Sequence, residues 1–259
     1  MRQSKLFTKT RKEAPADEVA KNAQLLIRAG YIYKNMAGAY TFLPLGLRVI
    51  GKINDIIREE MDAIGGQEMI MPSLQDSALW EASDRWSDDN VDVWFKSELK
   101  AGGVVVFAWT HEEVITDLMR QFISSYKDLP KFPYQIQKKF RNEMRAKSGI
   151  MRTREFDMKD LYSFSATQEQ HDKFYAACAD AYMKIFKRLG IGEQTYMTFA
   201  SGGAFSKFSH EFQTVCDAGE DIIYEKKKKK IALNKEIFNE KTLSDMGMKE
   251  EDSVTKKVA

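Results

Sequence analysis

Two stretches of alternating side chains, at residues 134–143 and 152–158, constrain this chain more than any other feature of its sequence. Successive residues of an extended strand point to opposite faces, so period-two alternation predicts a strand. A loop centred on Ser148-Gly149 separates the two stretches, and this order predicts a β-hairpin. The faces that we expect to meet carry Gln137, Lys139, Arg141 and Glu143 from the first stretch and Arg152, Arg154, Phe156 and Met158 from the second.

The predicted hairpin is strongly basic, although the whole chain carries a net charge of only +2. Residues 138–154 hold seven basic residues and one acidic residue, Glu143. Arginine forks pair bidentately with phosphate oxygens, and a phenylalanine ring offers a face for a base. The segment therefore favours nucleotide binding, although charge alone is equally typical of a solvated basic hairpin.

Length and composition indicate a globular protein of one large domain or two small ones, since the chain has 259 residues and is 43% hydrophobic. No apolar run approaches the roughly 20 residues that cross a bilayer, and no signal-peptide apolar region follows Met1. We therefore expect a cytoplasmic protein without membrane contact. Cys178 and Cys216 stand alone, which argues against a disulfide framework or a cysteine-cluster zinc site.

Apolar spacing and Gly or Pro breaks predict helices and strands over most of the chain. We expect helices at 17–29, 47–64 and 165–189, and strands at 68–71, 104–109 and 195–200. Residues 32–43 are expected to be a short strand or loop. Three tryptophans, Trp80, Trp86 and Trp94, lie in an acidic stretch at 73–98, which favours a surface excursion with aromatic anchors.

The residues Thr110-His111-Glu112-Glu113 follow a predicted strand and precede a helical stripe. A threonine and two carboxylates at such a junction are typical of an N-cap with acids in the first turn, worth about 1 kcal/mol. On the residue types alone, that structural interpretation is preferred over a binding site.

The hairpin resembles motif 2 of class II aminoacyl-tRNA synthetases, in the form found in bacterial-type prolyl-tRNA synthetases. The similarity lies in Phe140-Arg141-Asn142-Glu143, Arg152-Thr153-Arg154-Glu155-Phe156 and Met158-Lys159-Asp160, and it extends from Met1 to about Asp221. It implies an α+β fold, a class II synthetase-type antiparallel sheet flanked by helices and incomplete at its C-terminal end. Residues 1–225 would be the catalytic core with motifs 1 and 2, and residues 226–259, with the lysine run 226–230, a charged linker or the start of an inserted module.

The same resemblance implies the roles of individual residues in activating L-proline with ATP. Thr110-His111-Glu112 is similar to the T-x-E loop that binds the imino group of proline, although Ala108-Trp109 stands where the family usually has Gly-Pro. A segment at 201–212, with Gly202-Gly203 and His210, is similar to the border of the amino-acid pocket. The implied set is Arg141 and Glu143 for catalysis, Arg141, Arg152 and Phe156 for ATP, and Thr110, Glu112 and His210 for proline, with Mg²⁺ expected and no metal site in the protein.

The resemblance also implies tRNA(Pro) as a substrate of the complete enzyme and a homodimer. Residues 47–72 follow the order helix, break, strand and proline of motif 1, which builds the dimer interface around Pro72 in that family. Taken alone, the pattern is more typical of an ordinary amphipathic core helix.

No glycine-rich motif 3 with its arginine, and no anticodon-binding domain, is found after Asp221. We therefore expect the front part of a synthetase, inactive or severely impaired by itself. Two alternatives remain: a synthetase-like paralogue that acts as a binding or regulatory module, and a different class II specificity. The T-x-E loop and the lack of a Cys/His/His zinc set speak against threonine.

Overall fold

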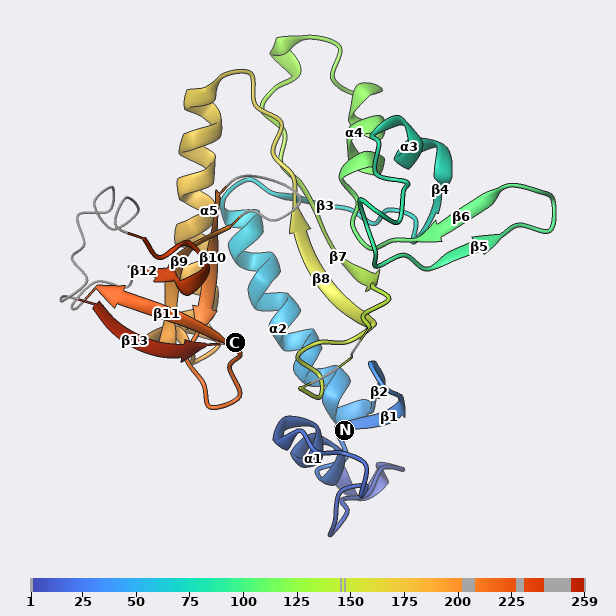
Figure 1. Cartoon of the computed structure of the whole chain (residues 1–259), viewed down its shortest axis with the longest axis vertical. Coiled ribbons are helices and arrows are strands. Elements are labelled where there is room, and N and C mark those ends of the chain that lie inside the picture. The colour runs from blue at the N-terminus through green and yellow to red at the C-terminus, as the bar shows by residue number, and fades with distance from the viewer. Residues whose placement is uncertain are drawn as a thin grey trace. The chain divides into compact units, whose positions relative to one another are not determined.

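The structure is a computed structural model, and it describes residues 2–144, 146, 148–201, 208–226, 231–239 and 253–258. The chain divides into two units, Met1–Asp172 and Lys173–Ala259 (Figure 1). Helices combine with sheets, and among the described residues most strand pairs are antiparallel and two are parallel. The predicted α+β class is confirmed. Short 3-10 helices lie at Gln3–Lys5, Tyr126–Asp128, Gly192–Gln194 and Lys235–Ile237.

The predicted hairpin is the centre of the first unit and is confirmed. Strands β7 (Pro133–Phe140) and β8 (Glu155–Leu161) pair antiparallel, with Lys139 opposite Phe156. Strand β3 (Gln67–Glu68) adds a parallel neighbour to β7, and it is shorter than the strand predicted over 68–71.

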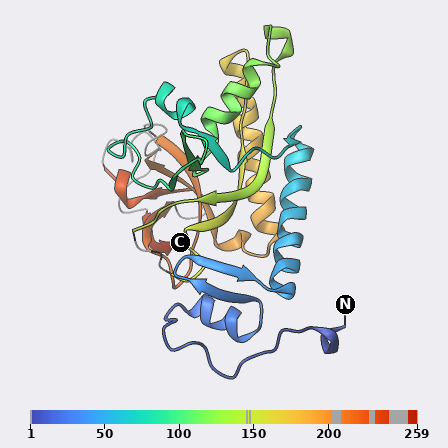
Figure 2. The same ribbon diagram turned by 90° about the vertical axis from the view of Figure 1, so that its right-hand side faces the viewer.

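Helix α2 (Pro44–Ala63) covers one face of this hairpin, and Figure 2 shows it running beside β7 and β8. It confirms the helix predicted over 47–64. The helix begins at Pro44, whose fixed φ suits the first helical position and whose missing N–H would have no partner there.

A small hairpin of β1 (Ile32–Met36) and β2 (Ala39–Phe42) forms where a strand or loop was expected. Gly38 turns it with φ +79°, and its carbonyl oxygen accepts hydrogen bonds from the backbone N–H groups of Arg154 (2.8 Å) and Glu155 (3.2 Å). The turn therefore holds the first residues of β8.

Helix α1 (Lys21–Arg28) contacts the loop between β7 and β8 at residues 148–150. The Asn22 side chain donates to the Ser148 carbonyl at 2.9 Å and accepts from the Ile150 N–H at 3.3 Å. Gly149 has φ +64° and lies so close to Asn22 that a Cβ atom would clash with it. The loop that carries Arg152 is thus held from α1.

A tryptophan core involves helix α3 (Ser77–Ala82) and a sheet of three strands in the order β4 (Leu74–Asp76), β6 (Val104–Phe107) and β5 (Lys96–Glu98). Trp80 is 0% exposed and Trp94 6%, and their ring centroids lie 5.0 Å apart in an edge arrangement, with Trp109 5.7 Å from each. The predicted aromatic anchors Trp80 and Trp94 are thus buried, and they pack against Val91 and Val106, whereas residues 81–90 of the same stretch are mainly exposed.

The second unit has a long helix, α5 (Gln168–Arg188), and a five-stranded sheet in the order β10-β9-β12-β11-β13. The strands are β9 (Thr195–Ser201), β10 (Phe208–Thr214), β11 (Asp221–Lys226), β12 (Ile231–Asn234) and β13 (Ser253–Val258). Strands β12 and β13 come from the segment expected to be a linker or a new module, and here they pair with β9 and β11. The glycine turn at 202–203 and the lysines at 227–230 lie outside the described residues.

None of the helices in the described part of the chain has both the length and the apolar character that crossing a bilayer requires.

Candidate active site

The two faces of the β7–β8 hairpin differ in their chemistry. One face carries Arg141 beside Phe156, with the guanidinium carbon 5.4 Å from the ring centroid. On the other face Lys138 pairs with Asp157 at 3.2 Å. Alternation along paired strands produces this separation, as the sequence pattern predicts.

The environment of Arg141 suits an anion. Burial lowers the pKa of its guanidinium, and the carboxylates of Glu143, Glu112 and Asp160 oppose that shift, although the group stays charged at neutral pH. Its Nε atom is buried and has no hydrogen-bond partner among the residues that the structure describes. A phosphate oxygen would give this donor the partner that a buried polar atom needs.

The Thr110-His111-Glu112 corner joins β6 to helix α4 (Glu112–Arg120). The Thr110 hydroxyl donates a hydrogen bond to the Glu112 carboxylate, and the Thr110 carbonyl accepts one from the Gln75 side chain at 3.0 Å. His111, not Thr110, occupies the N-cap position, and its side chain makes no cap hydrogen bond. The simple N-cap interpretation of Thr110 is therefore wrong.

The tryptophan core and the hairpin both hold this corner in place. Trp109 precedes Thr110 and packs among the buried rings, so the chain enters the corner from a rigid core. The Ala108 carbonyl accepts a hydrogen bond from the Phe140 N–H at 2.8 Å, one residue before Arg141. The structure therefore brings the corner and Arg141 together, and the Glu112 carboxylate acts electrostatically on the Arg141 guanidinium.

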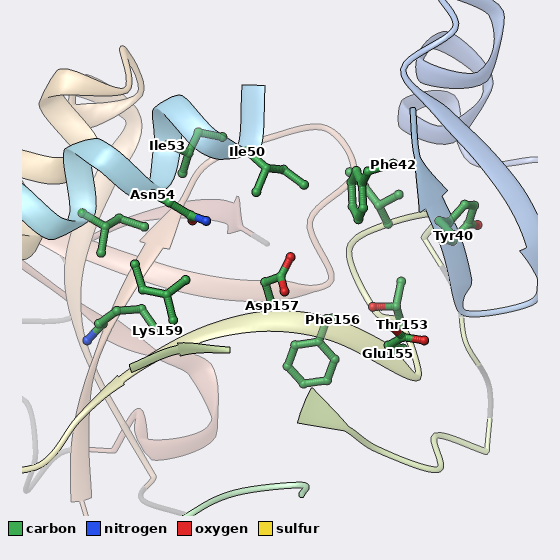
Figure 3. Close-up of a pocket in the computed structure, with 13 residues that line it drawn as sticks. Tyr40, Phe42, Ile50, Ile53, Asn54, Thr153, Glu155, Phe156, Asp157 and Lys159 are labelled. Atoms are coloured by element: carbon green, nitrogen blue, oxygen red, sulfur yellow. The ribbon is translucent and has the colours of Figure 1, made fainter. Parts of the chain in front are cut away.

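Two cavities border these elements. Glu112 lines an open hollow of about 470 Å³ whose walls come from α3, α4 and the residues after α3. A second cavity of about 290 Å³ lies between α2 and the hairpin, with apolar walls that include Ile50, Ile53 and Ile136. Figure 3 shows Asp157 pointing toward α2 in this cavity, whereas the Phe156 ring lies on the other side of β8.

The remaining predicted site residues of the first unit lie close to the hairpin. The Glu143 carboxylate is near enough to oppose the lowering of the Arg141 pKa, and the Glu143 carbonyl accepts a hydrogen bond from Arg154 at 3.1 Å. Arg152 is exposed in the loop before β8. Both lie in the loop that joins β7 to β8, whereas the alternation predicted them within strands over 134–143 and 152–158.

His210 belongs to the second unit, in the middle of β10. Its Nδ1 atom lies 2.9 Å from the Tyr175 hydroxyl of α5, and its ring meets Phe199 edge-on at 4.3 Å. Burial lowers the pKa of this histidine, so the ring is neutral at pH 7. A role for His210 in a proline pocket stays a prediction.

Sequence reasoning missed a buried polar cluster beneath the corner, made by Lys139 with His111, Asp160 and Tyr162. Alternation places Lys139 on the predicted inner face and Lys138 on the other, but no local pattern indicates that Lys139 is completely buried. Within the described ranges no group of three or more His, Cys, Asp or Glu side chains could hold a metal ion.

Residues 102–249 match the family described as tRNA synthetase class II core domain (G, H, P, S and T), and the chain belongs to this family. The chain is also similar to individual enzymes named Proline--tRNA ligase. It is 46% identical to that of Bacillus mycoides (strain KBAB4), 47% to that of Bacillus cytotoxicus and 46% to that of Bacillus cereus (strain G9842), in each case over 223 residues. Each match covers 86% of this chain and 39% of the relative, so the chain spans well under half the length of these relatives.

Proposed function

We propose that the complete protein is a proline–tRNA ligase that converts ATP, L-proline and tRNA(Pro) to prolyl-tRNA, AMP and pyrophosphate through prolyl-adenylate. One observation carries the proposal: the Thr110–Glu112 corner lies close enough to Arg141 for the charges of Glu112 and Arg141 to interact, and the Arg141 guanidinium lies 5.4 Å from the Phe156 ring. The similarity to three enzymes named Proline--tRNA ligase supports it.

The first step joins the proline carboxylate to the α-phosphorus of ATP, and pyrophosphate leaves. The attacking carboxylate is already ionised at pH 7, so no general base is needed. Positioning of the two substrates and neutralisation of developing negative charge provide the catalysis. We assign Arg141 to the α-phosphate, Phe156 to the adenine ring and Arg152 to a second contact with the nucleotide or the amino acid.

The corner is suited to an imino acid. The secondary ammonium of proline has two N–H donors, and burying it without acceptors would be costly. We assign Glu112 to accept from this ammonium, Thr110 to orient Glu112, Glu143 to an acceptor position near the adenine or the amino acid, and His210 to the border of the pocket.

Mg²⁺ would enter as part of the substrate, bound to the ATP phosphates. None of the steps proposed above is assigned to a protein-bound ion.

The complete protein would act in the cytoplasm as a homodimer. Motif 1 would form the interface around Pro72 and α2, and exposed apolar side chains in this region support the proposal: Leu47 is 61% exposed and Ile70 79%. We also propose residues 1–225 as the catalytic core and 226–259 as the start of an inserted module rather than a linker, since β12 and β13 of this segment pair with β9 and β11.

Calorimetry with non-hydrolysable aminoacyl-sulfamoyl adenosines tests the specificity. We expect the chain to bind the prolyl compound more tightly than the glycyl, histidyl, seryl and threonyl compounds. Replacing Glu112 by Gln should weaken prolyl binding by about 10- to 100-fold, because a charge-assisted hydrogen bond is lost.

The matched control is Asp117→Asn, which neutralises a 52% exposed carboxylate on the same helix. Its affinity should stay within about twofold of the unmodified chain, as for most surface changes. Tighter binding of another compound, or full prolyl affinity in Glu112→Gln, would contradict the proposal. Binding without proline-dependent ATP–pyrophosphate exchange by the complete protein would favour a binding module.

A further inference from the structure

Lys139 is completely buried in β7, an unusual place for a lysine. Its Nζ atom lies 3.0 Å from the Asp160 Oδ2 atom and 2.6 Å from the His111 Nδ1 atom. A buried ammonium is tolerated only with partners such as these. Burial lowers the pKa of Lys139, and the Asp160 carboxylate, 3.0 Å away, opposes this shift.

Asp160 gathers several donors from the inner face of the hairpin. Its Oδ2 atom accepts from the Gln135 side chain at 2.8 Å and from the Tyr162 hydroxyl, as well as from Lys139. The Tyr162 hydroxyl also interacts with the backbone of His111 through a hydrogen bond. The carboxylate is therefore the hub that joins β7 and β8 to the corner.

The hydrogen bonds of His111 determine where its proton resides. An ammonium can only donate, so the Nδ1 atom facing Lys139 must accept. The proton is then on Nε2, which lies 3.1 Å from the Pro72 carbonyl and donates to it. Burial and the Lys139 charge lower the pKa of His111 to about 4, so the ring is neutral at pH 7. Lys139, Asp160 and Tyr162 are the titratable groups that face it from the hairpin.

This tautomer matters for the binding corner because His111 stands between Thr110 and Glu112. The Nδ1 atom of its buried ring contacts Lys139 of the hairpin, and the Nε2 atom contacts the Pro72 carbonyl. The backbone on either side is then held in one orientation, and with it the two side chains assigned to the substrate.

We propose that Lys139 and Asp160 are positioning residues that fix the His111 ring as its Nε2–H tautomer and thereby aim Thr110 and Glu112 at a secondary-ammonium substrate. The secondary-ammonium ligand in this inference rests on the proposed function. The assignment of the His111 tautomer rests only on the hydrogen bonds among Lys139, His111, Asp160 and Pro72.

The neighbouring lysine provides a matched comparison. Lys138 is 38% exposed, pairs with Asp157 at 3.2 Å and lies on the opposite face of β7. The substitutions Lys139→Met and Lys138→Met remove the same chemical group from consecutive residues of one strand. Only the first removes the donor to His111.

Nitrogen-15 NMR of the histidine rings is the first test, with the His111 signals assigned by a His111→Gln variant. In the unmodified chain we expect a neutral Nε2–H ring from pH 5 to 8. Lys139→Met should raise the His111 pKa toward its ordinary value, since a nearby positive charge is lost, and Lys138→Met should not. A protonated ring at pH 7, or the Nδ1–H tautomer, in the unmodified chain would overturn the proposal.

Calorimetry is the second test, with ATP and prolyl-sulfamoyl adenosine titrated separately. Lys139→Met should weaken binding of the prolyl compound by about tenfold or more and leave ATP affinity within about twofold, because the loss is confined to the corner. Lys138→Met should change neither. Equal prolyl affinity in folded Lys139→Met would refute the positioning role.

Removing one partner of a buried pair can unfold a protein, so the double variant Lys139→Met/Asp160→Asn is a second route that leaves no unpaired charge. It should show the same selective loss of prolyl affinity, and unchanged affinity would refute the inference. Failure of the unmodified chain to bind the prolyl compound would reject the ligand proposed for the corner. The NMR result would still decide the tautomer.

Discussion

At the scale of single residues, the pairing of Arg141 with Phe156 decides how a nucleotide would be held. The guanidinium lies 5.4 Å from the ring centroid, and its buried Nε atom makes no hydrogen bond within the described ranges. An adenine that stacks on Phe156 would place a phosphate within reach of this fork. Affinity and orientation would then come from two neighbouring side chains on one strand pair.

Replacing Phe156 by Leu should therefore reduce ATP affinity. The substitution keeps an apolar side chain but removes the aromatic face, whose stacking contributes about 0.5–1.5 kcal/mol beyond its buried area. We expect an ATP dissociation constant about two- to tenfold higher in calorimetry. The control Phe122→Leu changes a ring that is 66% exposed on the surface and should leave ATP affinity unchanged. Equal ATP affinity in folded Phe156→Leu would remove the ring from the nucleotide site.

At the scale of elements, the active-site hairpin depends on segments far from it in sequence. The β1–β2 turn holds the start of β8 through the Gly38 carbonyl, and α1 holds the loop through Asn22. Ordering a long loop between two strands costs conformational entropy. The contacts that the small N-terminal elements make with this loop offset part of that cost. The site therefore depends on elements that contribute none of its predicted functional residues.

Gly38→Ala tests this support. A Cβ atom there would lie 2.9 Å from the Arg154 backbone nitrogen, and φ is +79°. Steric conflict and backbone strain together should lower the free energy of unfolding by about 1–3 kcal/mol in urea denaturation. Because the start of β8 would shift, ATP affinity should also fall.

The control for this substitution is Gly102→Ala. Gly102 has a similar φ of +88°, but no atom lies within 4 Å of its added Cβ. Gly102→Ala therefore introduces backbone strain without a steric clash. It should lower the free energy of unfolding by about 1 kcal/mol and leave ATP affinity unchanged. Equal effects of the two substitutions would show that contact with β8 is unimportant.

At the scale of the whole molecule, the proposed dimer concerns the surface around Pro72. Ile70 is 79% exposed just before the segment whose Pro72 carbonyl accepts from His111. A single large apolar side chain on a surface is common and needs no explanation. Two exposed ones in this region, Ile70 and Leu47, favour a surface that a second copy of the chain covers. Burial of this face between two copies would place the interface next to the segment that supports the binding corner.

Ile70→Glu should disrupt that assembly, since it would bury a carboxylate without a partner. In sedimentation velocity we expect the unmodified chain at twice its 29.8 kDa mass and the variant at the monomer mass. The control is Val19→Glu, which changes a side chain that is 88% exposed and lies outside residues 47–72. This variant should remain dimeric. A monomeric unmodified chain would rule out this interface for the chain.

Local patterns in the sequence were sufficient for the hairpin, its inner and outer faces, and helix α2. Alternation with period two and apolar spacing with period 3.6 arise from backbone geometry, so they appear in any short window of sequence. Resemblance to a family, not any local pattern, pointed to Thr110 and Glu112, because a threonine and an acid at a helix start are also typical of a simple cap.

Tertiary structure alone decided which polar residues meet and which aromatic rings are buried. Lys139 and His111 are 28 positions apart, and alternation assigns Lys138 and Lys139 to opposite faces without indicating that one is 38% and the other 0% exposed. The tryptophans of an acidic stretch form a core because they pack against one another and against Val91 and Val106. The physical reason is that burial and charge pairing depend on contacts between distant segments, whereas strand and helix periodicity depends only on neighbours along the chain.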